Sequence, residues 1–170
     1  MLDLLYSRHS IRNYSDQPVE TDKIETIIEA ALLSPSSRNR QPWEFIVVTD
    51  KKVLQQLSMA KPNGASFLAN ATMAVVIAGN TEKSDVWIED CSIAAIIIQL
   101  TAHDLGLGSC WIQLRERMHN ENTSSSAYVK DILRLPNHFE IGCIISIGYP
   151  AEGSKVNLKT KRSTEKVTRI

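Results

Sequence analysis

Two short clusters of polar residues near the start of this sequence are the parts best suited to bind a charged ligand. The first is Arg8-His9-Ser10-Ile11-Arg12, in which three cationic or potentially cationic side chains and a hydroxyl fall within five residues. Arginine presents a planar fork of donors that matches phosphate oxygens, and a charge-assisted hydrogen bond contributes about 1.5–3 kcal/mol. The first cluster therefore predicts a site for a phosphate dianion.

The second cluster, which spans Pro35 to Trp43, offers small hydroxyl and amide groups followed by a tryptophan. Its polar members are Ser36, Ser37, Asn39 and Gln41. Such groups suit the polar edge of a flat ring, so the two clusters together predict a phosphorylated aromatic cofactor. From spacing alone, a solvated basic loop and a helix-ending turn explain the same residues, because short basic motifs recur by chance and Ser and Asn favour turns.

The bulk composition is that of one globular domain over residues 1–170. The 19 basic and 19 acidic residues balance, whereas a nucleic-acid-binding face needs a basic excess, so we expect no nucleic-acid partner. No apolar run approaches the roughly 20 residues that span a bilayer, and the N-terminus lacks a basic, apolar leader. The three cysteines, Cys91, Cys110 and Cys143, show no Cys-x-x-Cys spacing, which favours reduced thiols and a cytoplasmic location.

The pattern of apolar residues predicts helices interspersed with strands, and therefore an α+β fold. One helix is expected to begin near Asp22, three residues before Glu25, and to end before Pro35. The other expected helices cover residues 51–59, 86–105 and 124–135, and the expected strands cover 45–48, 73–78, 109–114 and 141–148.

The helix expected over residues 86–105 is the longest element, and apolar residues surround it. A helix that is apolar all round is buried, and one small domain can hardly bury it alone, so this helix predicts a dimer core. The alternating residues 166–170 are expected to form an edge strand that pairs with the sheet of the neighbouring subunit.

Taken in order along the chain, five segments resemble motifs of the nitroreductase family of flavin-dependent oxidoreductases. They are Arg8-His9-Ser10-Ile11-Arg12-Asn13-Tyr14, residues 34–45, Trp87 to Ala95, Leu105 to Ile112, and Gly148-Tyr149-Pro150. The resemblance implies a nitroreductase-like fold: a central mixed or antiparallel sheet flanked by helices, in an intertwined homodimer that holds FMN at the subunit interface.

The resemblance also assigns cofactor contacts. Arg8, His9, Ser10 and Arg12 would bind the FMN phosphate, the ribityl chain or the pyrimidine edge, while Ser36, Ser37 and Asn39 would come from the other subunit. Lys161 and Arg162 would complete the phosphate site, Asn63 would contact the ring, and the backbone of Gln113 and Leu114 would lie near the reactive flavin nitrogen. The family often has glycine where this chain has Leu114.

By the same resemblance the flavin carries the chemistry, and neither a catalytic side chain nor a metal is needed. NAD(P)H would reduce the flavin, and a small electron-poor acceptor such as a nitroaromatic or a quinone would reoxidise it. The segment from Trp111 to Tyr128 is too short for a helix that covers the pocket, so we expect a shallow site. The alternatives are flavin cleavage, reductive dehalogenation, or FMN binding without catalysis.

The remaining candidates have simpler explanations. His103, His119 and His138 lack metal-ligand spacing, and Trp43 and Trp87 are expected to pack rather than to stack on a ligand. The pair Glu89-Asp90 suggests an acid pair, but carboxylates at a helix start are favoured by the helix dipole. Cys110, next to Trp111, is the one thiol to consider for reactivity.

Overall fold

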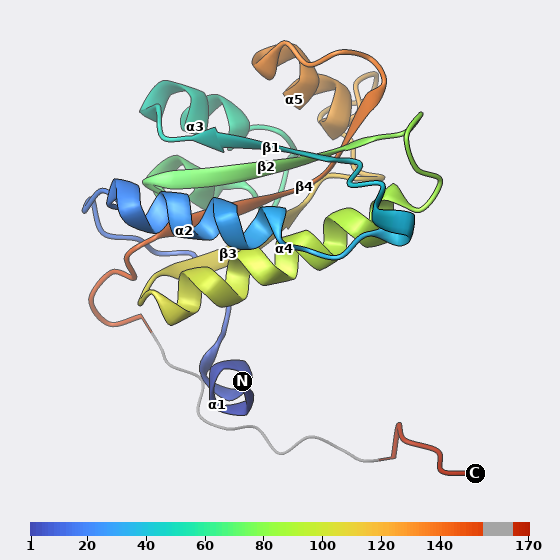
Figure 1. Ribbon diagram of the computed structural model, residues 1–170. Coiled ribbons are helices and arrows are strands. Elements are labelled where there is room, and N and C mark those ends of the chain that lie inside the picture. The colour runs from blue at the N-terminus through green and yellow to red at the C-terminus, as the bar shows by residue number, and fades with distance from the viewer. Residues whose placement is uncertain (155–164) are drawn as a thin grey trace.

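The computed structural model describes residues 1–154 and 165–170, which form an α+β fold (Figure 1). The helices are α1 (Leu2–Ser7), α2 (Thr21–Leu32), α3 (Lys51–Leu57), α4 (Trp87–Asp104) and α5 (Ser125–Leu133), with short 3-10 helices η1 (Ser37–Asn39) and η2 (Ser66–Asn70). The strands are β1 (Trp43–Val48), β2 (Met73–Asn80), β3 (Gly108–Gln113) and β4 (Phe139–Gly148).

The four strands form one sheet in the order β1-β2-β4-β3, and each neighbouring pair is antiparallel. The central strand β2 is buried along nearly its whole length, because alternate residues face opposite sides of the sheet and both sides are covered. Met73, Val75 and Ile77 enter one core, while Ala74 and Val76 enter the other.

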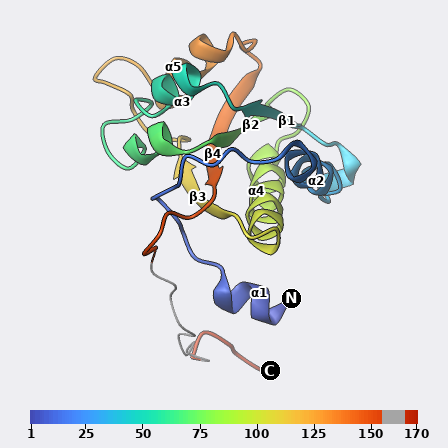
Figure 2. The same cartoon turned by 90° about the vertical axis from the view of Figure 1, so that its left-hand side faces the viewer.

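The helices form two layers around this sheet (Figure 2). Helices α2 and α4 cover one face, and α3 and α5 cover the other with η2 beside α3. Trp43 lies in the α4-side core and stacks on Phe45 at 5.9 Å, while Trp87 packs over Gly79. The prediction that both tryptophans are packing residues is consistent with these contacts.

Helix starts follow the local capping chemistry. Asp50 caps α3 by accepting from the amides of Lys52 and Val53, and Ser124 caps α5 by accepting from the Ala127 amide. Helix α2 begins at Thr21, close to the predicted start near Asp22, but no side chain caps it and Asp22 lies in its first turn. An acidic residue is favourable there through the helix dipole without serving as the cap.

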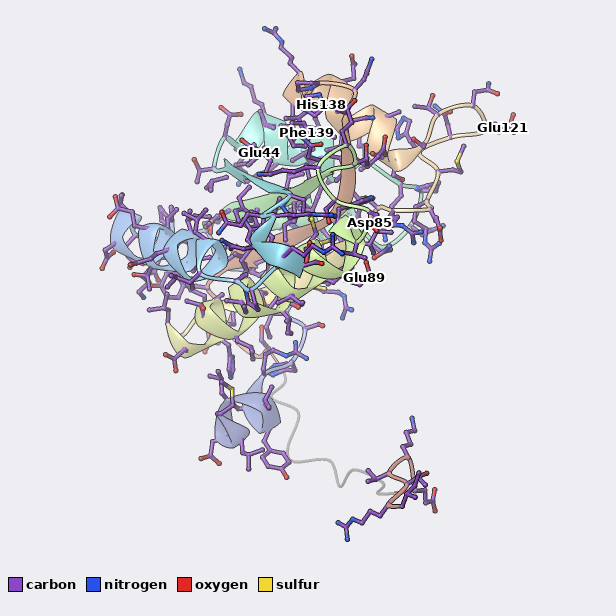
Figure 3. The ribbon with its side chains drawn as sticks, turned by 45° about the vertical axis from the view of Figure 1, so that its right-hand side comes forward. Glu44, Asp85, Glu89, Glu121, His138 and Phe139 are labelled. Carbon is purple, nitrogen blue, oxygen red and sulfur yellow. The ribbon has the colours of Figure 1, made fainter. Side chains whose placement is uncertain are left out.

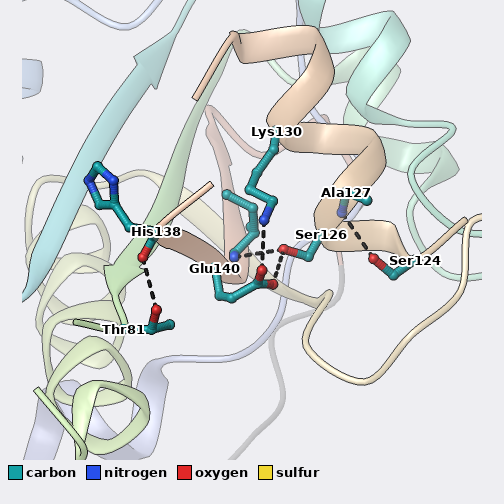
Figure 4. Close-up of polar contacts among 8 residues, drawn as sticks. Thr81, Ser124, Ser126, Ala127, Lys130, His138 and Glu140 are labelled. Carbon is teal, nitrogen blue, oxygen red and sulfur yellow. Dashed lines mark hydrogen bonds and ion pairs between the residues drawn. The ribbon is translucent and has the colours of Figure 1, made fainter. Parts of the chain in front are cut away.

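A polar cluster joins α5 to the start of β4 (Figure 4). The Glu140 carboxylate accepts from Ser126 Oγ and lies 2.6 Å from Lys130 Nζ, while Ser126 Oγ also accepts from the Ile141 amide. The strand begins at Phe139, two residues before the position that the apolar pattern predicted, because Phe139 and Glu140 pair with Asn80 and Gly79 of β2.

Helix α4 buries one side and leaves an apolar stripe open. Cys91, Ala94 and Ile98 face the sheet, whereas Ile93 and Ile96 are each 39 % exposed in the single chain. The sheet covers only one side of this helix, so a single chain does not bury it all round, as the sequence led us to expect; the dimer core itself stays a prediction. We name Ile93, Ile96, Ile97 and Leu100 the α4 stripe.

The edge strand expected over residues 166–170 does not form in this chain. A turn at residues 165–166 leads into irregular backbone, and Val167 and Ile170 are exposed. A strand needs a neighbour for its backbone groups, and none is paired with this segment within the described residues. In the same described ranges, no helix is long and apolar enough to cross a membrane.

Candidate functional site

The first predicted cluster lies along the exposed edge of β3. Ser10 forms a parallel bridge with Ser109, and the Ile11 amide donates to the Ser109 carbonyl at 3.0 Å. The Ile11 side chain is 7 % exposed and lies over Gly108. Successive side chains of extended backbone point to opposite sides, so burial of Ile11 directs the side chains of Ser10 and Arg12 away from the core.

Gly108 provides the space that lets this segment approach the strand. A Cβ at position 108 would lie 2.7 Å from Ile11 Cβ, so Gly108→Ala displaces the segment. We expect a loss of about 1–3 kcal/mol in the free energy of unfolding, as for other overpacked sites. Chemical denaturation measures the loss, and Gly142→Ala is the control, because its Cβ meets atoms only at 3.6 Å and beyond. Equal effects of the two substitutions would contradict the packing argument.

Arg8 and His9 lie on the side of this segment that faces α1 and the end of α4. His9 Nδ1 lies 2.9 Å from the Ser7 carbonyl, which only accepts, so Nδ1 carries the hydrogen. His9 Nε2 is buried and has no protein partner in the described chain. Ser7 Oγ lies 2.8 Å from His103 Nε2, and burial, followed by the charges of His9 and Arg8, lowers the pKa of His103. The orphaned Nε2 fits a ligand that supplies a hydrogen-bonding atom.

Arg12 lies on the other side of the segment, among groups that the sequence did not bring together. Its guanidinium carbon is 5.8 Å from the Phe67 ring centroid, and its charge acts on Cys110. Lys61 lies near the same thiol, and its pKa is lowered first by burial and then by the charge of Arg117. The sequence analysis did not include Lys61. The only sequence signal for it is its position two residues before the predicted contact Asn63.

Three of the remaining predicted cofactor contacts, Asn63, Gln113 and Leu114, are among the described residues, and two are not. Asn63 is exposed in the loop that follows Lys61. The Leu114 side chain is fully buried and its amide donates to the Gly142 carbonyl at 3.3 Å, so this amide could reach a cofactor only as a shared donor. Gln113 accepts from Trp111 Nε1 and donates to the Arg115 carbonyl. Lys161 and Arg162 fall within residues 155–164, outside the described residues.

Gln113 also lines a small pocket of about 50 Å³ between the start of α4 and strands β3 and β4. Its wall includes Trp87, Cys91, Trp111, Arg115 and Cys143. Burial raises the pKa of Cys91 to about 12, and burial raises the pKa of Cys143 well above its ordinary range, so both thiols stay protonated at neutral pH. Burial also raises the pKa of Cys110, against the opposing effect of Arg12, which disfavours a reactive thiolate there.

The second predicted cluster forms a tight loop around η1 at the start of α4. Arg38, Asn39 and Gln41 have φ values of 52°, 55° and 46°, in the left-handed region that non-glycine residues rarely adopt. Ser36 Oγ accepts from the Gln41 amide at 2.9 Å, and the Ser37 amide donates to Asp90 Oδ1 at 2.8 Å. Asp90 is therefore a loop contact, which the expectation of a simple helix-start carboxylate did not include.

The two clusters lie at opposite ends of α4 (Figure 1). The second is bonded to Asp90 at the start of this helix, and the first adjoins His103 at its end. Thirteen residues at 1.5 Å of rise each separate these anchors by about 20 Å. One chain therefore does not bring Ser37 to the same point as Ser10.

The histidines do not form a metal site. His119 stacks on Tyr128 and lies 2.8 Å from the Met59 carbonyl, while the His138 carbonyl accepts from Thr81. Within the described ranges, no group of three or more His, Cys, Asp or Glu side chains could hold a metal ion. The segment between β3 and α5 is a loop without a helix, which agrees with the predicted lack of a cover over the site.

Comparisons with known proteins agree with this arrangement. The profile of the nitroreductase family matches residues 5–63 and 55–149. An FMN-dependent nitroreductase structure from Clostridium difficile R20291 superimposes with a TM-score of 0.96 at 48% identity, over 99% of this chain and 98% of that one.

Curated sequences give the same result. A protein of Archaeoglobus fulgidus, named as a candidate NADH dehydrogenase/NAD(P)H nitroreductase, is 37% identical over 155 residues, covering 89% of this chain and 86% of its own. The FMN reductase (NADPH) of Bacillus subtilis is 24% identical over 170 residues, covering 88% of this chain and 66% of its own. The motif order, the antiparallel sheet and these matches lead to one conclusion: the chain belongs to the nitroreductase family.

Proposed function

We propose that this protein is an FMN-dependent oxidoreductase that passes electrons from NAD(P)H to small electron-poor acceptors such as nitroaromatics or quinones. The observation that carries the proposal is the group of cations beside the edge of β3. Arg8, Arg12 and Lys61 form no ion pair with a carboxylate among the described residues. A ligand phosphate and an electron-rich ring edge would supply the missing negative charge.

The residues present fit FMN in chemistry and in position. Arg8 would face the phosphate, His9 Nε2 would accept from a hydroxyl of the ribityl chain, and Ser10 would bind the phosphate or the ribityl chain. Arg12 and Lys61, on the other side of the segment, would face the pyrimidine edge together with Asn63. The backbone near Gln113 is a further contact, and Lys161 and Arg162 are proposed for the phosphate from the family motif alone.

Bound FMN would accept a hydride from the nicotinamide and return electrons to the acceptor. The chain's own contribution is to hold the ring in place and to stabilise negative charge on it. Lys61 supplies positive charge in a partly buried place, where electrostatic interactions are stronger than in water, and Arg12 adds positive charge from an exposed position. The open loop between β3 and α5 leaves room for small acceptors, with Met59 and Met118 exposed at its rim.

A second copy of the chain completes this site in the proposal. Ser36, Ser37 and Asn39 lie at the start of α4, about 20 Å along the helix from the His103 end where the first cluster lies, so they would serve the cofactor of the other subunit. The α4 stripe offers an apolar face for the contact between the two copies. We place the homodimer in the cytoplasm, because all three cysteines are unpaired.

The absorption spectrum of the purified protein tests this function. We expect the visible bands of a flavin, loss of these bands on anaerobic addition of NADH or NADPH, and their return with a nitroaromatic or a quinone. A colourless protein that stays colourless with added FMN would refute the proposal. FMN that binds but is reduced by neither nicotinamide would instead indicate a non-catalytic flavin-binding protein, and turnover only with a halogenated acceptor would indicate reductive dehalogenation.

A further inference from the structure

We propose that Asp90 is the positioning residue of the second half of the cofactor site. Its buried carboxylate holds the Ser37 amide, so that the loop of residues 36–41 presents Ser36, Ser37 and Asn39 in a fixed arrangement. This inference rests on the proposed function, because those three side chains matter only if they reach the flavin of the other subunit.

The loop needs an anchor because its backbone is strained. Arg38, Asn39 and Gln41 all take left-handed φ values although none is glycine. Such conformations persist only where surrounding contacts over-determine them. The bonds inside the loop, from the Gln41 amide to Ser36 Oγ and from Gln41 Nε2 to Asn39 Oδ1, tie the loop only to itself. They do not set its place relative to α4.

Asp90 supplies the link to the rest of the fold. It is 2 % exposed, and its two carboxylate oxygens accept from the Ser37 amide at 2.8 Å and from Ser84 Oγ at 3.4 Å. No ion pair to Asp90 occurs among the described residues, so these donors and the N-terminus of the 18-residue helix α4 stabilise its charge. A buried carboxylate without hydrogen bonds raises the free energy of the folded state. The position of the Ser37 amide relative to the Asp90 carboxylate is therefore narrowly fixed.

The other contacts to the loop lie on the surface. Arg40 pairs with Asp85 at 2.7 Å, but Asp85 is 84 % exposed, and Lys83 Nζ donates to the Gln41 carbonyl from an exposed position. Figure 3 shows Asp85 and Glu89 near the start of α4, beside η1. Exposed ion pairs contribute little to stability. Asp90 is therefore the buried contact that fixes the loop, and Asp85 offers a matched control.

Flavin titration of three variants tests the proposal. Asp90→Ala should weaken FMN binding at least tenfold, which equals about 1.4 kcal/mol. Asp90→Asn keeps an oxygen acceptor for the Ser37 amide and should stay within about threefold of wild type. Asp85→Ala should change binding less than about twofold. Unchanged affinity in Asp90→Ala, or a tenfold loss in Asp90→Asn, would overturn the assignment.

Hydrogen exchange of the Ser37 amide in the flavin-free protein gives a second readout. Asp90→Ala should raise this exchange rate at least tenfold, with little change in Asp90→Asn, and an unchanged rate would overturn the proposal. If Asp90→Ala does not fold, Asp90→Glu keeps the charge but moves the acceptor by one methylene, and should show the same losses. Wild-type protein that fails to bind FMN refutes the proposed function instead, while the exchange measurement still decides the role of Asp90.

Discussion

We expect Arg8→Ala to weaken FMN binding by about 1.5–3 kcal/mol, which corresponds to roughly a ten- to hundredfold rise in Kd. The physical reason is the loss of one charge-assisted hydrogen bond to the cofactor phosphate. Arg8 has no carboxylate partner in the described chain, so its removal leaves no buried acid unpaired. Fluorescence titration of the flavin-free protein measures the change.

Riboflavin, which lacks the phosphate, is the matched control ligand. Its affinity should be the same for wild type and Arg8→Ala, because the proposed contact is absent in both. Lys52→Ala, an exposed lysine in α3, is the control for loss of one positive charge and should leave FMN affinity unchanged. Equal weakening of FMN and riboflavin would show that Arg8 shapes the segment rather than binds phosphate.

An aspartate at Ile96 converts the proposed dimer into a monomer. Ile96 is 39 % exposed in the single chain and lies in the α4 stripe, so the new carboxylate would be buried only when two copies meet. Burial of an unpaired charge in an apolar contact costs several kcal/mol. Sedimentation should give the mass of one chain for Ile96→Asp where wild type gives two, and FMN binding should weaken because Ser37 no longer reaches the other site.

We choose Ile96 for the substitution rather than the neighbouring Ile97, because Ile97 is more buried within its own chain and a charge there would also disturb the fold. Ala127→Asp is the control, because it adds the same charge to an exposed position of α5 on the other side of the sheet. That variant should keep the wild-type mass. A dimer of unchanged affinity in Ile96→Asp would place the subunit contact elsewhere.

Short-range patterns account for most of what could be predicted. The apolar run of β2 and the helical spacing of apolar residues in α3 predicted these two elements, because each pattern depends only on neighbours a few residues away. The order of five motifs indicated the nitroreductase family, and the family profile confirmed it. Boundaries were less accurate: β4 begins at Phe139, two residues before the predicted start, because Phe139 and Glu140 pair with Asn80 and Gly79 of β2.

Contacts between distant segments could not be predicted in this way. Lys61 and Arg12 come near each other only because the loop before η2 and the first cluster both lie close to Cys110, which is 98 residues after Arg12 in sequence. Asp90 was assigned a general role at a helix start, whereas its specific partner is an amide 53 residues away. Neither contact leaves a periodic signal along the chain.

Residue types and the order of the motifs were enough to identify the nitroreductase family, and they predict cations and a hydroxyl for a phosphate and small polar groups for a ring. Only the folded arrangement placed the two clusters at opposite ends of α4, where their anchors Asp90 and His103 are about 20 Å apart along the helix. The reason is geometric, because a rigid helix of 18 residues holds the segments at its two ends apart. The local sequence does not show which segments will contact those ends.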